Sequence, residues 1–274
     1  GTSMPPPLRT IDGIEVFVDG DGPQAVVMIH GWPDTHHLWD GTVAALQDRY
    51  RCVRFTLPGF DRLQAPRPTS LDAMTRLFAA IVDAVSPAQP VTLLLHDWGC
   101  VFGYEFAARH PGRMSRIVAV DIGDHHSADF ARSLTAKAKW QIFSYQCWLA
   151  IAWMMGRHVN AALGRRMTRA MAHSLRCPTP ADAVDWPMNY PYAMQWFGLA
   201  GGFRNAAPVR PPCPLLYLYG ERKPFMFHSP QWLRWLQDSP GSEAHGFCSG
   251  HWVMVDQAQA FNERVRHWLG NTGE

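Results

Sequence analysis

The stretch that decides the fold is "TLLLHDWGCVFGYEFAARHPGRM", which covers residues 92–114. It begins with an uninterrupted apolar run, which is typical of a strand buried on both faces. It continues with apolar residues at helical spacing, among them Phe102, Phe106 and Ala107. Between the two lies "HDWG", residues 96–99, so Asp97 stands at the corner between a buried strand and a helix. Asp is common at helix starts, so this acid is explained either by a helix cap or by chemistry.

The design of this stretch recurs along the chain. Short apolar runs that end in turn residues occur at "AVVMIHGWP", "RCVRFTLPGF", "SRIVAVDIGD" and "PLLYLYGERKP". Helical patterns lie between them, and the spacing predicts helices over 70–85 and 99–110. Near the start, "IEVFVDGDGP" alternates and then turns, which predicts a hairpin at its Gly-Asp-Gly. Apolar strands separated by helices indicate an α/β fold with a doubly wound, mainly parallel sheet.

This rhythm breaks between about Asp124 and Pro208. The stretch is rich in Trp, Met and Tyr, contains no strand-like run, and reads as several helices. The linker "PVRPPCP" then leads back to a strand. We therefore expect a core domain formed by residues 4–124 and 208–272, with a helical cap domain inserted at residues 125–207.

The composition limits the classes of function. The chain is 47% hydrophobic and 18% charged, with a formal net charge of +2 and no run of Lys or Arg, so it carries no footprint for nucleic acid or an acidic membrane surface. No apolar run approaches the roughly 20 residues that span a bilayer, and the start lacks the apolar core of a signal peptide. The six scattered cysteines show no zinc-binding spacing and read as reduced thiols. We expect a soluble, cytoplasmic protein, and the sequence leaves a homodimer open.

Four of the predicted strands end in residues that carry chemistry. These ends are "HGWPD" at 30–34, "HDWG" at 96–99, Asp121 with Asp124, and the "SGHW" segment at 249–252. In an open parallel sheet, reactive groups gather beyond the carboxyl ends of the strands. A tight turn from strand to helix also presents backbone N–H groups to negative charge. The sequence therefore predicts a site at this edge of the sheet.

The order of these motifs resembles the α/β-hydrolase superfamily, and within it the branch that uses an Asp nucleophile. The resemblance covers most of the chain and implies that Asp97 is the nucleophile and His251 the base. A carboxylate attacks an alkyl carbon to form an ester, which His-activated water then cleaves. The resemblance also implies an oxyanion site from the backbone N–H groups of Trp32 and Trp98, with a cis bond between Trp32 and Pro33. His30 and His96 are expected to shape the turns.

The acid that orients His251 is less clearly placed by the resemblance. The family usually has an Asp in a G-x-x-D pattern after the next-to-last strand, but this chain reads "YGERKPF" and has Lys223 there. A second recognised location is the end of the strand after the elbow helix, where "VAVDIGD" offers Asp121. We expect Asp121 to take this role, and Asp124 and Glu221 are the alternatives. A turn or loop-start Asp is the competing explanation for Asp121.

The resemblance extends to epoxide hydrolases and haloalkane dehalogenases, which differ in the leaving group. Epoxide hydrolases protonate the ring oxygen with two cap tyrosines. "F-x-Y-Q" matches the first at Tyr145, while "MNYPYAMQWF" offers Tyr192, which we favour, or Tyr190 for the second. Aromatic packing is the competing explanation for all three. The substrate-binding residues expected are Trp32, Trp98, Gln146, Trp148 and Trp196.

A halide instead needs N–H donors, and this chain has Trp32 where many dehalogenases have Asn. However, Leu95 before His96 and an acid at Asp121 look dehalogenase-like. We favour an epoxide hydrolase for a small apolar or aromatic epoxide and water, and a haloalkane dehalogenase is the first alternative. A catalytically inactive binding protein is the second. A metal enzyme, suggested by "DIGDHH" and "THH", lacks ligand spacing, so no metal or cofactor is expected.

Overall fold

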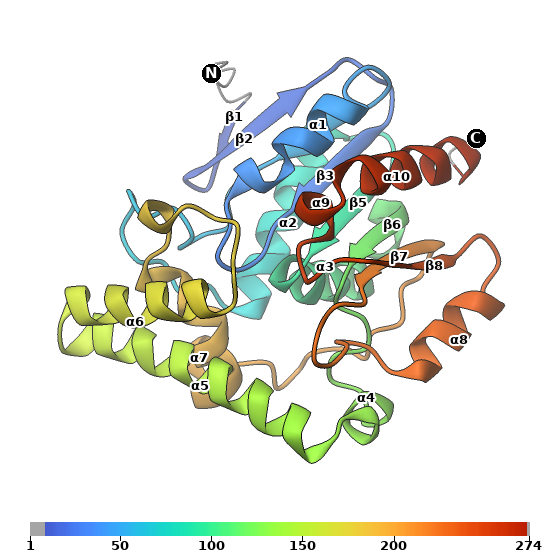
Figure 1. Ribbon diagram of the computed structural model, residues 1–274. Coiled ribbons are helices and arrows are strands. Elements are labelled where there is room, and N and C mark those ends of the chain that lie inside the picture. Colours follow the sequence, from blue (N-terminus) through green and yellow to red (C-terminus); the bar gives the residue numbers. More distant parts are fainter. Residues whose placement is uncertain (1–8, 273–274) are drawn as a thin grey trace.

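The computed structural model describes residues 9–272 and contains an eight-stranded sheet in the order β1-β2-β4-β3-β5-β6-β7-β8 (Figure 1). Strands β1 and β2 pair antiparallel, as do β2 and β4, and every other neighbouring pair is parallel. The strands are β1 Arg9–Ile11, β2 Ile14–Asp19, β3 Ala25–Ile29, β4 Arg51–Arg54, β5 Val91–His96, β6 Met114–Val120, β7 Leu215–Gly220 and β8 Glu243–Phe247.

Helices cover both faces of this sheet. The α-helices are α1 Asp40–Leu46, α2 Leu71–Val85, α3 Trp98–Arg109, α4 Ala128–Ser133, α5 Ala136–His158, α6 Ala161–Ser174, α7 Tyr190–Phe197, α8 Pro230–Asp238, α9 Val253–Asp256 and α10 Ala258–Thr272. Short 3₁₀ helices occur at His36–Trp39, Pro111–Arg113, Ala181–Ala183, Trp186–Asn189 and Leu199–Gly201. The helices predicted over 70–85 and 99–110 correspond to α2 and α3, and the Ser70 hydroxyl caps α2.

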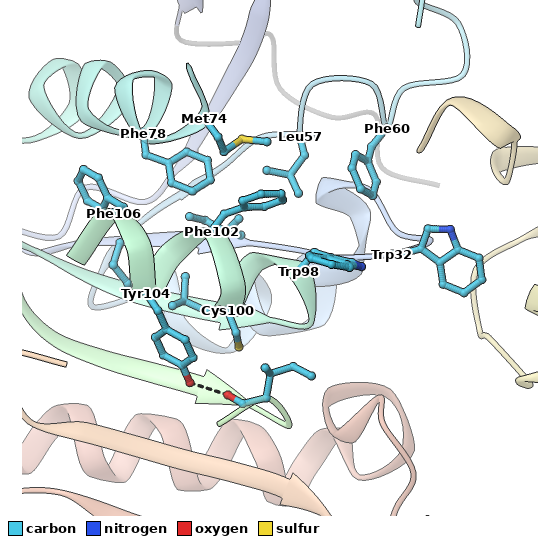
Figure 2. Close-up of a cluster of buried hydrophobic side chains, with 14 of the residues drawn as sticks. Trp32, Leu57, Phe60, Met74, Phe78, Trp98, Cys100, Phe102, Tyr104 and Phe106 are labelled. Carbon is cyan, nitrogen blue, oxygen red and sulfur yellow. Dashed lines mark hydrogen bonds between the residues drawn. The ribbon is translucent and has the colours of Figure 1, made fainter. Parts of the chain in front are cut away.

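Two apolar cores form because successive side chains of a strand point to opposite faces. On one face, Val27 and Leu93 pack with α2 and α3, and Figure 2 shows Phe78 of α2 close to Phe102 of α3. On the other face, Val26, Leu94 and their neighbours pack with side chains of α1 and α10. The strands are apolar on both sides for this reason, and the predicted doubly wound sheet is confirmed.

The hairpin at the start of the chain lies earlier than the sequence pattern predicted. Its turn is at Asp12 and Gly13, which both have positive φ, and it joins β1 to β2. After Gly-Asp-Gly the chain does not return along β2, because β3 is inserted between β4 and β5. The predicted turn therefore connects two strands that do not pair.

The segment between β6 and β7 is helical, as its composition predicted. It contains α4, α5, α6 and α7, and α5 packs against both α6 and α7 on one side of the sheet (Figure 1). The division into a core and a cap with borders at residues 125 and 207 stays a prediction, and residues 4–8 of it lie outside the described residues. Within residues 9–272, no helix is both long and apolar enough to cross a bilayer.

Candidate active site

The corner at Asp97 is a strained elbow rather than a helix cap. Asp97 has φ 56° and ψ −124°, a conformation that costs a non-glycine residue about 1–3 kcal/mol. Its side chain accepts no capping hydrogen bond from α3, which begins at the next residue. Close approach of the backbone makes the elbow tight, because a Cβ on Gly31 would lie 2.4 Å from the Cβ of Asp97. The helix-cap explanation for Asp97 is therefore wrong.

The Asp97 carboxylate is held on both oxygens. The backbone N–H of Trp32 donates to Oδ2 at 2.8 Å, and Oδ1 lies 3.0 Å from Nε2 of His251. The Trp32–Pro33 bond is cis, which confirms that prediction. The backbone nitrogen of Trp98 and Oδ2 of Asp97 both line the space beside Gly31, 2.6 and 2.5 Å from where a Cβ on that glycine would lie. The hydrogen bond from the Trp32 N–H supports the oxyanion site, which stays a prediction.

His251 bridges two carboxylates that come from distant parts of the chain. Its Nδ1 lies 2.5 Å from Oδ2 of Asp121, which is 130 positions away in the sequence. Asp121 follows β6, is fully buried, and also accepts a hydrogen bond on Oδ1 from the backbone N–H of Gly220. The structure therefore brings together Asp97, His251 and Asp121, the three residues that the sequence singled out.

The two alternatives to Asp121 lie elsewhere. The Asp124 carboxylate accepts hydrogen bonds from the backbone N–H and hydroxyl of Ser229 and from the Ser127 hydroxyl, at 2.6–2.8 Å. It therefore ties the loop after β6 to the start of α8. Glu221 is exposed and lies over Gly246 of β8. Neither carboxylate has a hydrogen bond to His251, which agrees with the preference for Asp121 over both alternatives.

Lys223 joins the site in a way that the sequence reading missed. Its Nζ donates to both oxygens of Asp121 at 2.6 Å, and its side chain is only 8% exposed. Lys223 stands where the family pattern has an Asp. It is thus the cationic partner of Asp121, the acid at the second recognised location. The available signal was chemical, since an ammonium group near a buried strand end needs a carboxylate partner.

The charges at the site shift the pKa values of all three groups. Burial lowers the pKa of His251, but hydrogen bonds to Asp121 and Asp97 outweigh it and raise the pKa from 6.5 to about 9. Burial raises the pKa of Asp97, yet the hydrogen bond and charge of His251 bring it below its ordinary value. Burial also raises the pKa of Asp121, but the charges and hydrogen bonds of Lys223 and His251 outweigh it and bring that pKa below its ordinary value. The resting site at neutral pH thus holds an imidazolium between two carboxylates.

The two histidines at neighbouring strand ends bond to backbone atoms, as expected of residues that shape turns. His30 Nε2 accepts from the Leu57 N–H, and its Nδ1 donates to the Gly31 carbonyl. His96 Nε2 donates to the carbonyl of His251 at 2.9 Å. Burial lowers the pKa of His30 to about 4 and that of His96 to about 3, so both are neutral.

The three candidate tyrosines fall into two groups. Tyr145 of α5 and Tyr192 of α7 meet edge to face, with ring centroids 6.2 Å apart, and both line cavities that reach Asp97. Burial raises the pKa of both hydroxyls above 10, so both carry a proton at neutral pH. Tyr190 is fully buried, and its hydroxyl donates to the Pro58 carbonyl at 2.7 Å. The Tyr190 hydroxyl is thus occupied by a backbone carbonyl, which agrees with the preference for Tyr192, and the role of Tyr192 stays a prediction.

Two cavities meet at the elbow, with volumes of about 330 and 860 Å³. Asp97, Tyr145, Tyr192 and Phe227 line both of them. The smaller cavity is also lined by Trp98, Gln146 and Trp196, and the larger one by Trp32, Trp148 and Lys223. The five residues expected to bind substrate are thus divided between the two cavities.

Several of these side chains already have partners. The Trp32 indole donates to Asn189 Oδ1 at 2.7 Å, and Asn189 in turn donates to Thr168. Gln146 donates to the Tyr145 hydroxyl and accepts from the Trp196 indole. The Trp148 indole donates to the carbonyl of Met167. Trp32 and Trp148 therefore contribute ring surface rather than a free N–H donor.

Among residues 9–272 no group of three or more His, Cys, Asp or Glu side chains is arranged to hold a metal ion. His125 and His126 of the "DIGDHH" motif contact each other through their rings, with nitrogens 3.4 Å apart. The "THH" motif places His36 against the Thr56 hydroxyl, 2.7 Å away. These pairs are separate and do not form one set of ligands.

Comparisons with known proteins agree with this architecture. The chain is 40% identical over 115 residues to the probable oxidoreductase EphD of Mycobacterium tuberculosis, which is 39% of this chain and 19% of that protein. The chain thus spans less than a fifth of that relative. It is 24% identical over 272 residues to the cis-3-alkyl-4-alkyloxetan-2-one decarboxylase of Shewanella oneidensis, covering 93% of this chain and 84% of the other.

Solved structures show the same fold. An epoxide hydrolase of Bacillus megaterium in complex with an inhibitor superimposes with a TM-score of 0.68 at 19% identity, over 94% of this chain and 96% of that one. The family described as alpha/beta hydrolase fold matches residues 24–176, more than half of the 274 residues. The elbow, the strand order and this match together establish that the chain belongs to the alpha/beta hydrolase fold family.

Proposed function

We propose that this protein is an epoxide hydrolase that opens an epoxide to a vicinal diol through an alkyl ester on Asp97. The observation that carries the proposal is that Asp97, Tyr145 and Tyr192 line both cavities. The Asp97 carboxylate is held there by His251 and by a backbone N–H, and both tyrosines are protonated. Ring opening needs these two functions together, a nucleophile for carbon and a proton donor for oxygen.

In the first step, an oxygen of Asp97 attacks one ring carbon of the epoxide. A C–O ester bond forms as the C–O bond of the ring breaks, and the ring oxygen takes a proton from Tyr145 or Tyr192. The oxygen that accepts from the Trp32 N–H becomes the ester carbonyl oxygen. Burial supports this role for the tyrosines, because it keeps their hydroxyls protonated until an alkoxide forms.

In the second step, His251 first releases its own proton to solvent, because the esterified Asp97 no longer carries a charge to hold it. The neutral imidazole then removes a proton from water, which attacks the carbonyl carbon of the ester. The negative charge that develops on the carbonyl oxygen lies near the backbone nitrogens of Trp32 and Trp98. The acyl C–O bond then breaks, the departing alkoxide takes the proton from His251, and Asp97 is regenerated. The tyrosinate recovers its proton from the carboxylic acid formed on Asp97, so the net reaction adds one water to one epoxide.

The donors at the elbow favour an epoxide over a haloalkane. A halide would need indole N–H groups, but the Trp32 indole is already bound to Asn189. The Trp98 ring packs edge to face against the Tyr192 ring, with centroids 5.2 Å apart. A ring oxygen can be received by the tyrosine hydroxyls without breaking the bond between Trp32 and Asn189. Haloalkane dehalogenase, which uses the same nucleophile, is the alternative that the test must separate.

The test uses a His251→Gln variant, which is expected to stall at the ester because it lacks the base. Separate samples are incubated with an aryl epoxide, a bromoalkane and an alkyl oxetanone, the ring named for the Shewanella relative. Mass spectrometry of the intact protein and its peptides then locates any adduct, and an Asp97→Ala/His251→Gln variant is the control. An epoxide adduct on Asp97 is the expected result. An adduct from the bromoalkane alone would make the protein a dehalogenase, and no epoxide adduct would overturn the proposal.

A further inference from the structure

The site contains a cation, Lys223, that contacts His251 only through Asp121. Lys223 is held after β7 by its contacts with Asp121, and its Nζ also lies 5.3 Å from the centre of the Phe227 ring. Burying an ammonium group is costly unless it is paired and hydrogen-bonded, and here two short bonds to one carboxylate meet that need. The arrangement gives Asp121 three separate donors, namely Lys223, His251 and the Gly220 N–H.

The charges that face His251 come from several elements. Asp97 lies at the corner between β5 and α3, Asp121 follows β6, and the neutral His96 ring at the end of β5 packs 4.4 Å from the imidazole. Asp34 lies further away, bound to the Trp252 indole. Arg222 and Asp256 line the same cavity as His251, and Lys223 reaches the imidazole through Asp121, which bonds to both.

The balance of these charges changes during the reaction that we propose above, on which this inference rests. Before attack, two carboxylates stabilise a protonated His251. Once Asp97 is an ester it carries no charge, so only Asp121 continues to hold the proton on the imidazole. His251 must lose that proton to act as a base for water.

We propose that Lys223 is a positioning residue of the hydrolytic step: its ammonium group fixes both oxygens of Asp121 and offsets the charge of that carboxylate, so that Asp121 orients His251 without holding it as imidazolium. Lys223 acts through Asp121 and does not touch the reacting atoms. An uncompensated Asp121 would still orient the ring. It would also keep the imidazole protonated to higher pH and slow cleavage of the ester.

The electrostatic part of the inference is tested without any substrate. The imidazole of His251 is followed by NMR in protein labelled at histidine, with the resonance assigned by its absence from His251→Gln. Lys223→Gln removes the charge but keeps a hydrogen-bond donor. In this variant the midpoint of the His251 titration is expected to rise by about one pH unit. Lys139→Gln makes the same change at an exposed site on α5, and Lys223→Arg keeps the charge. Both are expected to titrate like the wild type.

The consequence for catalysis is tested by the pH dependence of kcat with an epoxide. In Lys223→Gln the ascending limb is expected to move to higher pH, so that kcat at pH 7 falls about tenfold and recovers in alkali. A purely structural role would lower kcat at every pH without moving the limb. That result, or an unchanged NMR midpoint, would overturn the inference.

Two further points keep the outcomes distinct. If Lys223→Gln does not fold, Lys223→Met is the second charge-free variant, and a midpoint raised equally in Lys223→Arg would also overturn the inference. If the wild type turns over no epoxide, the proposed function fails. The NMR titration then still decides whether Lys223 controls the charge of His251.

Discussion

The two halves of the candidate site are built in different ways. At the edge of the sheet, Asp97, His251 and Asp121 are joined by direct hydrogen bonds of 2.5–3.0 Å, and two of them have positive φ. On the helical side, Tyr145 and Tyr192 meet only through their rings, and Gln146 links Tyr145 to a partly exposed Trp196. The backbone fixes the first group, whereas packing of α5 against α7 fixes the second.

The two halves of the site therefore differ in how rigidly they hold their side chains. Residues on strand ends are held by a sheet with two covered faces, so their geometry is rigid. Residues on the helices depend on side-chain packing, which tolerates replacement more easily. Changes at the sheet edge should therefore abolish chemistry, while changes on the helices should reduce it by degrees.

The largest effect is expected for Asp97→Asn, which removes the nucleophile and should lower the rate of diol formation by about 10³-fold or more. The matched change Asp124→Asn alters a carboxylate near the same edge that binds Ser127 and Ser229. It should lower the melting temperature and leave most of the activity. Equal losses of activity in both variants would contradict the assignment of Asp97. Steady-state kinetics and thermal unfolding measure the two effects.

The next effect concerns the pH dependence of stability at the sheet edge. The folded pKa of His251 is raised to about 9 from 6.5, so its contribution is fully present below pH 6.5 and is lost as the pH rises through 9. The difference in unfolding free energy between the wild type and His251→Gln should therefore shrink over this window, by about 3 kcal/mol. Urea unfolding at a series of pH values measures it. A difference that stays constant from pH 6.5 to 9 would argue against the charged pairs.

A smaller effect is expected on the helical side. Tyr145→Phe and Tyr192→Phe each remove one proton donor and should lower kcat/KM for an epoxide by about 10- to 100-fold, since the other hydroxyl remains. Tyr190→Phe is the matched control, because that hydroxyl binds the Pro58 carbonyl. It should cost about 1–2 kcal/mol of stability and little activity. If Tyr190→Phe were the most damaging of the three, the choice of Tyr192 would be wrong.

The smallest effect tests the link between the two halves. Asn189 accepts from the Trp32 indole beside the elbow and donates to Thr168 of α6. Asn189→Ala should lower the unfolding free energy by about 1–2 kcal/mol, because it leaves a buried indole N–H without an acceptor. Asn205→Ala, at an exposed position in the loop before β7, is the control for the loss of an exposed amide. An effect of Asn189→Ala no larger than that of the control would show that this network does not couple the halves.

Much of the sheet could be predicted from the sequence, because a strand that is buried on both faces consists of consecutive apolar residues. The elbow, and with it Asp97, followed from a turn between such a run and a helical pattern. Strand β8 is not an apolar run, since Glu243–Phe247 is only partly buried at the edge of the sheet, and the sequence marked it only through the "SGHW" segment that follows it. The hairpin turn was misplaced for a related reason, because the pattern marks a turn and does not say which strands pair.

The sequence by itself thus determined the fold class, the strand ends that meet at one edge, and the residue types gathered there. Only the tertiary structure decided which side chains are partners. Tyr190 and Tyr192 are two residues apart on α7, so they point in different directions and find different neighbours. Lys223 and Asp121 are 102 positions apart, and Asp124 and Ser229 are 105 apart. Local patterns fix the backbone, but hydrogen bonds and charge pairs between distant segments form only when the sheet brings their ends together.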